Sequence, residues 1–78
     1  PNPFNSVCKI KYNLPAGTGK PVILIYNILG EQIDVLDNLP ATPGEHAIQW
    51  RTDAPSGSYI VRLDVNGSVR QKKLIYLK

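Results

Sequence analysis

The sequence predicts an all-β protein, an antiparallel sandwich of short strands, and three observations support this prediction. Apolar and polar side chains alternate with a period of two in several short runs, as they do in half-buried strands. The seven prolines are spaced so that no stretch is typical of a long amphipathic helix. The six glycines fall at the breaks between the runs, where turns are expected.

The first half of the chain contains three predicted strands. Residues 8–14 alternate Cys, Ile, Tyr and Leu with Lys and Asn, which indicates a strand with one buried face. A loop over residues 15–20 follows. Residues 21–27 are then apolar on both faces and rich in β-branched side chains, which is typical of a central strand. A turn at residues 28–31 leads into the third strand, residues 32–36.

The second half continues the same pattern. Residues 37–44 contain two prolines and form a connection, after which residues 45–51 alternate again. Residues 58–65 alternate Tyr, Val, Leu and Val against Ile, Arg and Asp. The Asn-Gly pair at 66–67 is a strong signal for a tight hairpin, and residues 69–77 return as the partner strand. Six or seven strands spaced by about 8 to 12 residues favour an antiparallel immunoglobulin-like β-sandwich of about seven short strands.

The apolar faces of these strands supply the predicted core. We expect Trp50, Tyr59 and Ile48 at its centre and Phe4 at one end. Cys8 shares an apolar face with its neighbours and is expected to be a small buried hydrophobe. A chain of 78 residues buries only about 60% of its unfolded surface. Little room remains for an enclosed substrate pocket, which usually needs roughly 300 Å³ or more.

Composition limits the class of protein further. The longest apolar run is residues 22–26, whereas a membrane-spanning helix needs about 20 such residues, so we expect no transmembrane segment. A single cysteine excludes an intrachain disulfide and a cysteine-rich metal site. The chain contains no Met and no signal segment at its start. We therefore expect residues 1–78 to be a single domain excised from a longer protein.

The positive charge lies in the C-terminal tail. The net charge is +3, yet Arg70, Lys72, Lys73 and Lys78 alone contribute +4, and residues 1–69 carry −1. A basic tail can bind nucleic acid or an anionic surface. Alternating lysines also keep an edge strand soluble and prevent unwanted pairing. We favour the second interpretation over nucleic acid, because no aromatic stacking platform accompanies the charges.

Candidate catalytic and ligand-binding motifs are weak. A zinc site needs three or four ligands, which His46 and Cys8 alone cannot supply, and a Cys-His nucleophile pair would use a cysteine expected to be buried. The acidic residues lack the spacing of a calcium loop. Residues 17–20 resemble a phosphate loop but lack its length and its strand-to-helix context. We therefore predict that the domain is not an enzyme and holds no metal or cofactor.

Two surface functions are also weakly supported. The glycosylation pattern at residues 66–68 is explained by the hairpin turn. Binding of sugars needs a platform of exposed aromatic rings, and Tyr12, Tyr26 and Tyr76 are the aromatic residues left once the predicted core is filled.

Five short motifs, in order along the chain, resemble those of one bacterial family. They are Pro1-Asn2-Pro3-Phe4-Asn5 at the start, Tyr26-Asn27-Ile28-Leu29-Gly30-Glu31 after the central strand, Gly44 before the strand that ends in Trp50, Ser56-Gly57-Ser58-Tyr59-Ile60-Val61-Arg62-Leu63 with the spacing Gly-x-Tyr-x-x-x-Leu, and Lys72-Lys73-Leu74-Ile75-Tyr76-Leu77-Lys78 at the end. Together they resemble the C-terminal sorting domain of the bacterial type IX secretion system, also called the Por secretion system. Cys8 stands where this family is expected to have Thr or Val.

A second relative is the immunoglobulin-like domain of flagellar hook-capping proteins, which shares the opening motif and the Tyr-Asn-x-x-Gly turn. That domain usually has a longer insertion between its Trp and its Gly-x-Tyr. Only residues 51–56 intervene here, which favours the sorting domain.

The resemblance to the sorting domain implies a targeting role. It implies that the domain directs an attached cargo protein across the outer membrane of a diderm bacterium, from the periplasm to the cell surface or the medium. The implied partners are the outer-membrane secretion machinery and a sorting peptidase. The implied recognition tail is Arg70, Lys72, Lys73, Leu74, Ile75, Tyr76, Leu77 and Lys78. The motif residues with an expected structural role are Pro1, Asn2, Pro3, Gly30, Trp50, Gly57, Tyr59 and Leu63.

Two other classes of function stay open at this point. The domain could be an immunoglobulin-like structural or carbohydrate-binding accessory module of a secreted hydrolase, which would favour exposed aromatic rings on one sheet face. It could also be an assembly domain like that of the hook cap, which would predict self-association.

Overall fold

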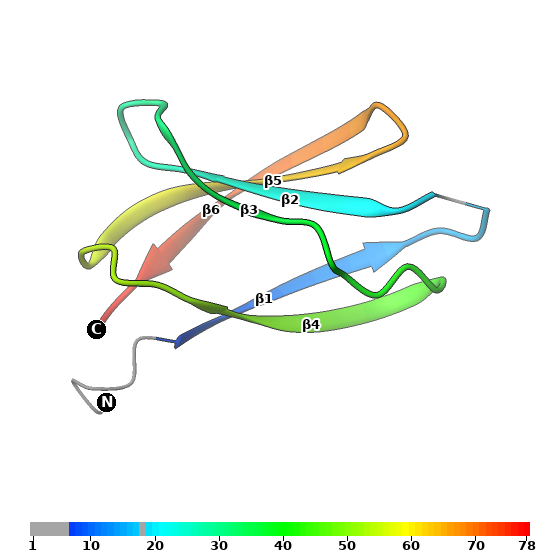
Figure 1. Ribbon diagram of the computed structural model, residues 1–78, viewed down its shortest axis with the longest axis horizontal. Helices are drawn as coiled ribbons and strands as arrows, with labels where there is room; N and C mark the ends of the chain where they lie inside the picture. The colour runs from blue at the N-terminus through cyan, green and yellow to red at the C-terminus, as the bar shows by residue number, and fades with distance from the viewer. Residues whose placement is uncertain (1–6, 18) are drawn as a thin grey trace.

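A computed structural model describes residues 7–17 and 19–78 of the chain (Figure 1). These residues contain six β-strands and no helix. The strands are β1 (Val7–Leu14), β2 (Pro21–Tyr26), β3 (Gln32–Leu36), β4 (Gly44–Arg51), β5 (Gly57–Val65) and β6 (Ser68–Tyr76). The predicted all-β class is therefore confirmed.

The strands form two antiparallel sheets of unequal width. One contains β1 and β4, and the other has the order β3-β2-β5-β6. Figure 1 shows the two-stranded sheet lying across one face of the four-stranded sheet. This arrangement is consistent with an immunoglobulin-like sandwich. The prediction that residues 21–27 form a central strand is confirmed, because β2 pairs with β3 on one side and with β5 on the other.

The turn between β2 and β3 is built by Asn27. Its side-chain oxygen accepts hydrogen bonds from the backbone N–H groups of Leu29 and Glu31, each at 2.9 Å, and its amide nitrogen donates to the Glu31 carboxylate at 2.8 Å. Gly30 has a φ of +82°, which a residue with a side chain rarely adopts. These contacts explain why the Tyr-Asn-x-x-Gly sequence ends one strand and starts the next.

The predicted hairpin between β5 and β6 is confirmed. Asn66 and Gly67 have φ angles of +53° and +81°, the pair of positive values that a tight type I′ turn requires. The Gly67 N–H also donates to the Asp64 carboxylate at 3.2 Å. This turn sets the register in which Val65 lies opposite Ser68 and Gly57 lies opposite Tyr76.

The core lies between the two sheets and contains a cluster of three aromatic rings, Trp50, Tyr59 and Tyr76. Their centroids are 5.5 to 6.3 Å apart in tilted or edge-on arrangements, the separations that aromatic pairs prefer. The buried set consists of Ile10, Tyr12, Leu14, Ile23, Ile25, Trp50, Tyr59, Val61, Val65 and Tyr76. The predicted burial of Trp50 and Tyr59 is therefore confirmed.

Three expectations about the core need adjustment. The interpretation of Tyr12 and Tyr76 as rings left over for the surface is wrong, because they are 8% and 1% exposed. Both strands turn these rings toward the space between the sheets. Ile48 is half-buried and packs against the core from its margin, as does Cys8. Phe4 lies outside the described residues, as do the motif residues Pro1, Asn2 and Pro3.

We expect Trp50→Ala to lower the free energy of unfolding by about 3–5 kcal/mol, because it removes the largest buried side chain. Small domains have only about 5–15 kcal/mol in total, so little folded protein should remain. Urea denaturation followed by circular dichroism measures the effect. Ile75→Ala is the control, since Ile75 is 55% exposed and its loss should change stability by about 0.5 kcal/mol or less. Equal urea midpoints for Trp50→Ala and the parent protein would contradict the packing described here.

Candidate recognition surface on the terminal strand

Residues 70–76 of the basic tail lie in β6, which is an edge strand. β6 pairs with β5 along its whole length, and no strand of the described residues pairs with its other side. Its outer edge therefore presents backbone donors and acceptors that are not used in the ladder. Such an edge can pair with an extended segment of another protein.

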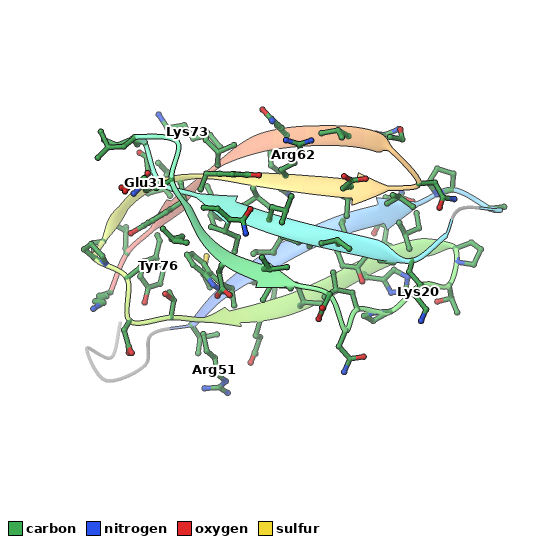
Figure 2. All side chains as sticks on the ribbon, turned by 45° about the horizontal axis from the view of Figure 1, so that its top comes forward. Lys20, Glu31, Arg51, Arg62, Lys73 and Tyr76 are labelled. Atoms are coloured by element: carbon green, nitrogen blue, oxygen red, sulfur yellow. The ribbon has the colours of Figure 1, made fainter. Side chains whose placement is uncertain are left out.

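Alternate side chains of β6 point to opposite faces of the sheet. Tyr76 and Leu74 lie opposite Gly57 and Tyr59 and face the core side, whereas Lys73 faces outward. Figure 2 shows Tyr76 between the two sheets and Lys73 on the outside of the four-stranded sheet. The tail is therefore not one uniform surface but a strand with two faces of different character.

The apolar residues of the tail divide between these faces. Tyr76 is 1% exposed and Leu74 packs partly buried against the core. Ile75 and Leu77, by contrast, are 55% and 71% exposed. The family resemblance implied all four residues as part of the recognition tail, but of the four only Ile75 and Leu77 are exposed in the folded domain.

The end of β6 is fastened to the segment that precedes β5. The Tyr76 hydroxyl donates to the backbone carbonyl of Thr52 at 3.4 Å. The Lys78 N–H donates to the Ser56 hydroxyl at 2.9 Å, and its ammonium group donates to the Asp53 carbonyl at 3.3 Å. Lys78 is thus exposed, but its hydrogen bonds hold it against the segment that precedes β5.

Two basic residues of the tail lie on the core-side face, near the hairpin. Lys72 lies opposite Val61 and Arg70 lies opposite Leu63, yet both are exposed. The Lys72 ammonium group donates to the backbone carbonyl of Lys11 on β1 at 2.8 Å. This bond joins the two sheets on the side where β1 and β6 approach each other. Sequence analysis missed it, although the alternation along residues 70–76 does place Lys72 on the same face as Tyr76.

The remaining motif residues have structural positions. Gly57 begins β5 opposite Tyr76, at the point where the chain enters the four-stranded sheet. Tyr59 belongs to the aromatic cluster, and Leu63 packs partly buried against the core. Gly30 and Trp50 have the turn and core positions described above.

The two residues considered for nucleophilic catalysis are far apart. Cys8 lies opposite Trp50 and His46 lies opposite Tyr12, so four residues, about 14 Å of strand, separate them. Burial raises the pKa of the Cys8 thiol, which disfavours the reactive thiolate. The His46 ring donates to the Thr42 carbonyl at 2.7 Å and packs against the Tyr12 ring. His46 therefore has a structural position at the margin of the core.

The described residues offer neither a metal-binding cluster nor a membrane-spanning helix. No group of three or more His, Cys, Asp or Glu residues among them lies close enough to hold a metal ion. Within the same part of the chain, no helix is long and apolar enough to cross a membrane.

A comparison with protein families decides between the interpretations left open by the sequence. Residues 1–77 match the model of the secretion system C-terminal sorting domain. The chain belongs to this family. No curated protein and no solved structure shows significant similarity to the chain.

Membership in the sorting-domain family gives the function of the chain in outline. The domain is a C-terminal sorting signal for type IX secretion, and it is non-catalytic. Its role implies an interaction with the secretion machinery. The protein is secreted, or attached to the cell surface, by this system.

We expect a Cys8→Ser, His46→Gln double variant to be exported as well as the parent domain. The physical reason is that these side chains are separated along the strands and make only packing and local hydrogen-bond contacts. The measurement is the amount of a fused reporter at the cell surface and in the medium, with thermal melting as the control for folding. A stably folded double variant that stays in the periplasm would show that one of these residues acts in sorting.

Proposed function

We propose that residues 70–78 are the element of the sorting domain that the secretion machinery recognises, and that the rest of the sandwich holds them in place. The observation that carries the proposal is the position of β6. Among the described residues it is an edge strand with a free side, and residues 70–78, which include most of it, carry four of the nine basic residues of the chain.

In this proposal one face of β6 anchors the strand and the other face is open to the partner. Tyr76 and Leu74 anchor the strand in the core, so that its position is fixed before any partner arrives. Lys73 and Ile75 lie on the opposite face and Leu77 follows the end of the strand, and together they form an exposed strip that is basic at one end and apolar at the other. A prearranged strip of this kind lowers the entropy that binding would otherwise lose.

We also propose the context in which the domain acts. Sorting requires an attached cargo, and the domain is the C-terminal part of a larger secreted protein, for example a hydrolase. A surface peptidase then separates the domain from its cargo after export. The family role of the domain supports both statements.

The carbohydrate-binding alternative loses its main support. It would need exposed aromatic rings, and of the three left outside the predicted core, Tyr12 and Tyr76 are buried. Tyr26 is half-buried, and one ring does not make a stacking platform.

Export of a reporter tests the recognition proposal. The domain is fused to a periplasmic reporter in a bacterium that carries the type IX system. We expect two changes to trap the folded reporter in the periplasm: the pair Lys72→Ala/Lys73→Ala, and removal of residues 77–78. The first change removes exposed side chains of β6 and the second removes the exposed residues that follow it, and both leave Leu74 and Tyr76 in place.

A matched control removes the same charge elsewhere. The pair Lys20→Ala/Arg51→Ala deletes two exposed cations outside the tail and should leave export unchanged. Resistance to protease in the periplasm checks that each variant is folded. If the tail variants reach the surface as efficiently as this control, the tail is not the recognition element.

A further inference from the structure

The two sheets leave part of the core-side face of the four-stranded sheet without a covering strand. In the described residues, β1 pairs only with β4, and β6 pairs only with β5. The free edges of β1 and β6 lie close to each other, because Lys72 on β6 reaches the Lys11 carbonyl on β1. A gap bounded by two unpaired strand edges therefore runs along this side of the sandwich.

A groove of about 270 Å³ occupies this gap. The core residues Ile10, Ile23 and Val61 form its floor together with the half-buried Leu63. Residues 11–13 of β1 form one wall, and residues 70–72 of β6 form the other. The groove is therefore apolar at its base and polar along both sides.

The backbone of β1 turns hydrogen-bonding groups toward this groove. The N–H and C=O of one residue in an antiparallel strand point to the same side, and the side alternates from residue to residue. The Lys11 carbonyl points to β6, so the backbone groups of Lys9, Lys11 and Asn13 all point away from β4. An extended segment lying in the groove could pair with this row.

The rim of the groove has one sign of charge. Lys11, Arg70 and Lys72 are among the ten residues that line it, and none of the ten is acidic. The stem of Lys72 crosses from one wall to the other and covers part of the apolar floor. An occupant that offers carboxylates would compensate the ammonium groups when it displaces this side chain.

We propose that the groove binds an extended, acidic segment of a partner protein, which adds as a strand to the free edge of β1. Its alternate apolar side chains would lie on the floor, and its acidic side chains would meet Lys11, Arg70 and Lys72. A second copy that pairs through its own β6 does not fit the same description, because Arg70, Lys72 and Lys73 would bring a basic strand to a basic rim. The inference rests on the proposed function, since it gives the chemistry of the machinery segment that the sorting domain contacts.

A synthetic peptide tests the groove in solution. The probe is an acetylated heptapeptide that alternates glutamate and valine, and the control peptide has lysine in place of each glutamate. We expect the acidic peptide to shift the NMR signals of the amides of Lys9, Lys11, Asn13 and residues 70–72, and to bind more weakly as salt is added. No binding of the acidic peptide, or equal binding of both peptides, would overturn the proposal.

Adjacent residues on β6 provide a matched pair of variants. Lys72→Glu reverses a charge at the groove, and Lys73→Glu makes the same change on the outer face of the same strand. We expect Lys72→Glu to weaken peptide binding about ten-fold, or about 1.4 kcal/mol, and Lys73→Glu to leave it nearly unchanged. Arg70→Glu is a second reversal at the rim, so the conclusion does not depend on the Lys72 hydrogen bond alone. Weakening by Lys73→Glu equal to that by Lys72→Glu would contradict a site in the groove.

The same variants separate this inference from the recognition proposal in cells. Retained export of Lys72→Glu and Arg70→Glu, together with lost export after removal of residues 77–78, would refute the groove and leave the tail as the recognition element. Export of all of them would refute both.

A photo-reactive residue at position 13 should cross-link the domain to a protein of the secretion machinery. A cross-link to its own cargo polypeptide, or to a second copy, would identify a different occupant and overturn the proposal.

Discussion

The aromatic cluster of Trp50, Tyr59 and Tyr76 is the contact on which the rest of the structure depends. Each ring comes from a different strand, and each polar tip has a partner outside the cluster. The Trp50 indole N–H donates to the Asp34 carboxylate at 2.7 Å, and the Tyr59 hydroxyl donates to the Pro55 carbonyl. The cluster thus links β3, β4, β5 and β6 at one end of the sandwich. Burying a polar atom without a hydrogen-bond partner costs free energy, and the polar atoms of this cluster avoid that cost because each has a partner.

The position of this cluster explains why β6 changes character along its length. The strand is covered where Tyr76 and Leu74 meet the cluster and the core, and it is uncovered nearer the hairpin, where Arg70 and Lys72 replace them on the same face. A sheet of two strands cannot cover the whole face of a sheet of four. The uncovered part is therefore at the edge, and the basic side chains that lie there are compatible with water.

Sequence alone predicted the elements well, because each depends on a local pattern. The strand Gln32–Leu36, the Asn66-Gly67 hairpin and the central place of β2 all follow from alternation, turn residues or apolar runs. Tyr12 and Tyr76 were misplaced for a different reason. Their burial depends on how wide each sheet is and how the sheets face each other, and no short window of sequence contains that information. The contact between Lys72 and Lys11 spans 61 residues and lies beyond local patterns in the same way.

The charge of the tail bears on two properties of the free edge of β6, self-association and the choice of a partner. A free strand edge flanked by exposed Ile75 and Leu77 invites pairing between copies of the same chain. Lys73 on one face and Lys72 on the other place positive charge beside that edge, so a copy that approaches with its own β6 meets repulsion on both faces. The same charges attract an acidic partner. Basic residues on both faces of β6 therefore oppose pairing with a second β6 and favour pairing with an acidic segment. A neutral polar strand would discriminate less between these two partners.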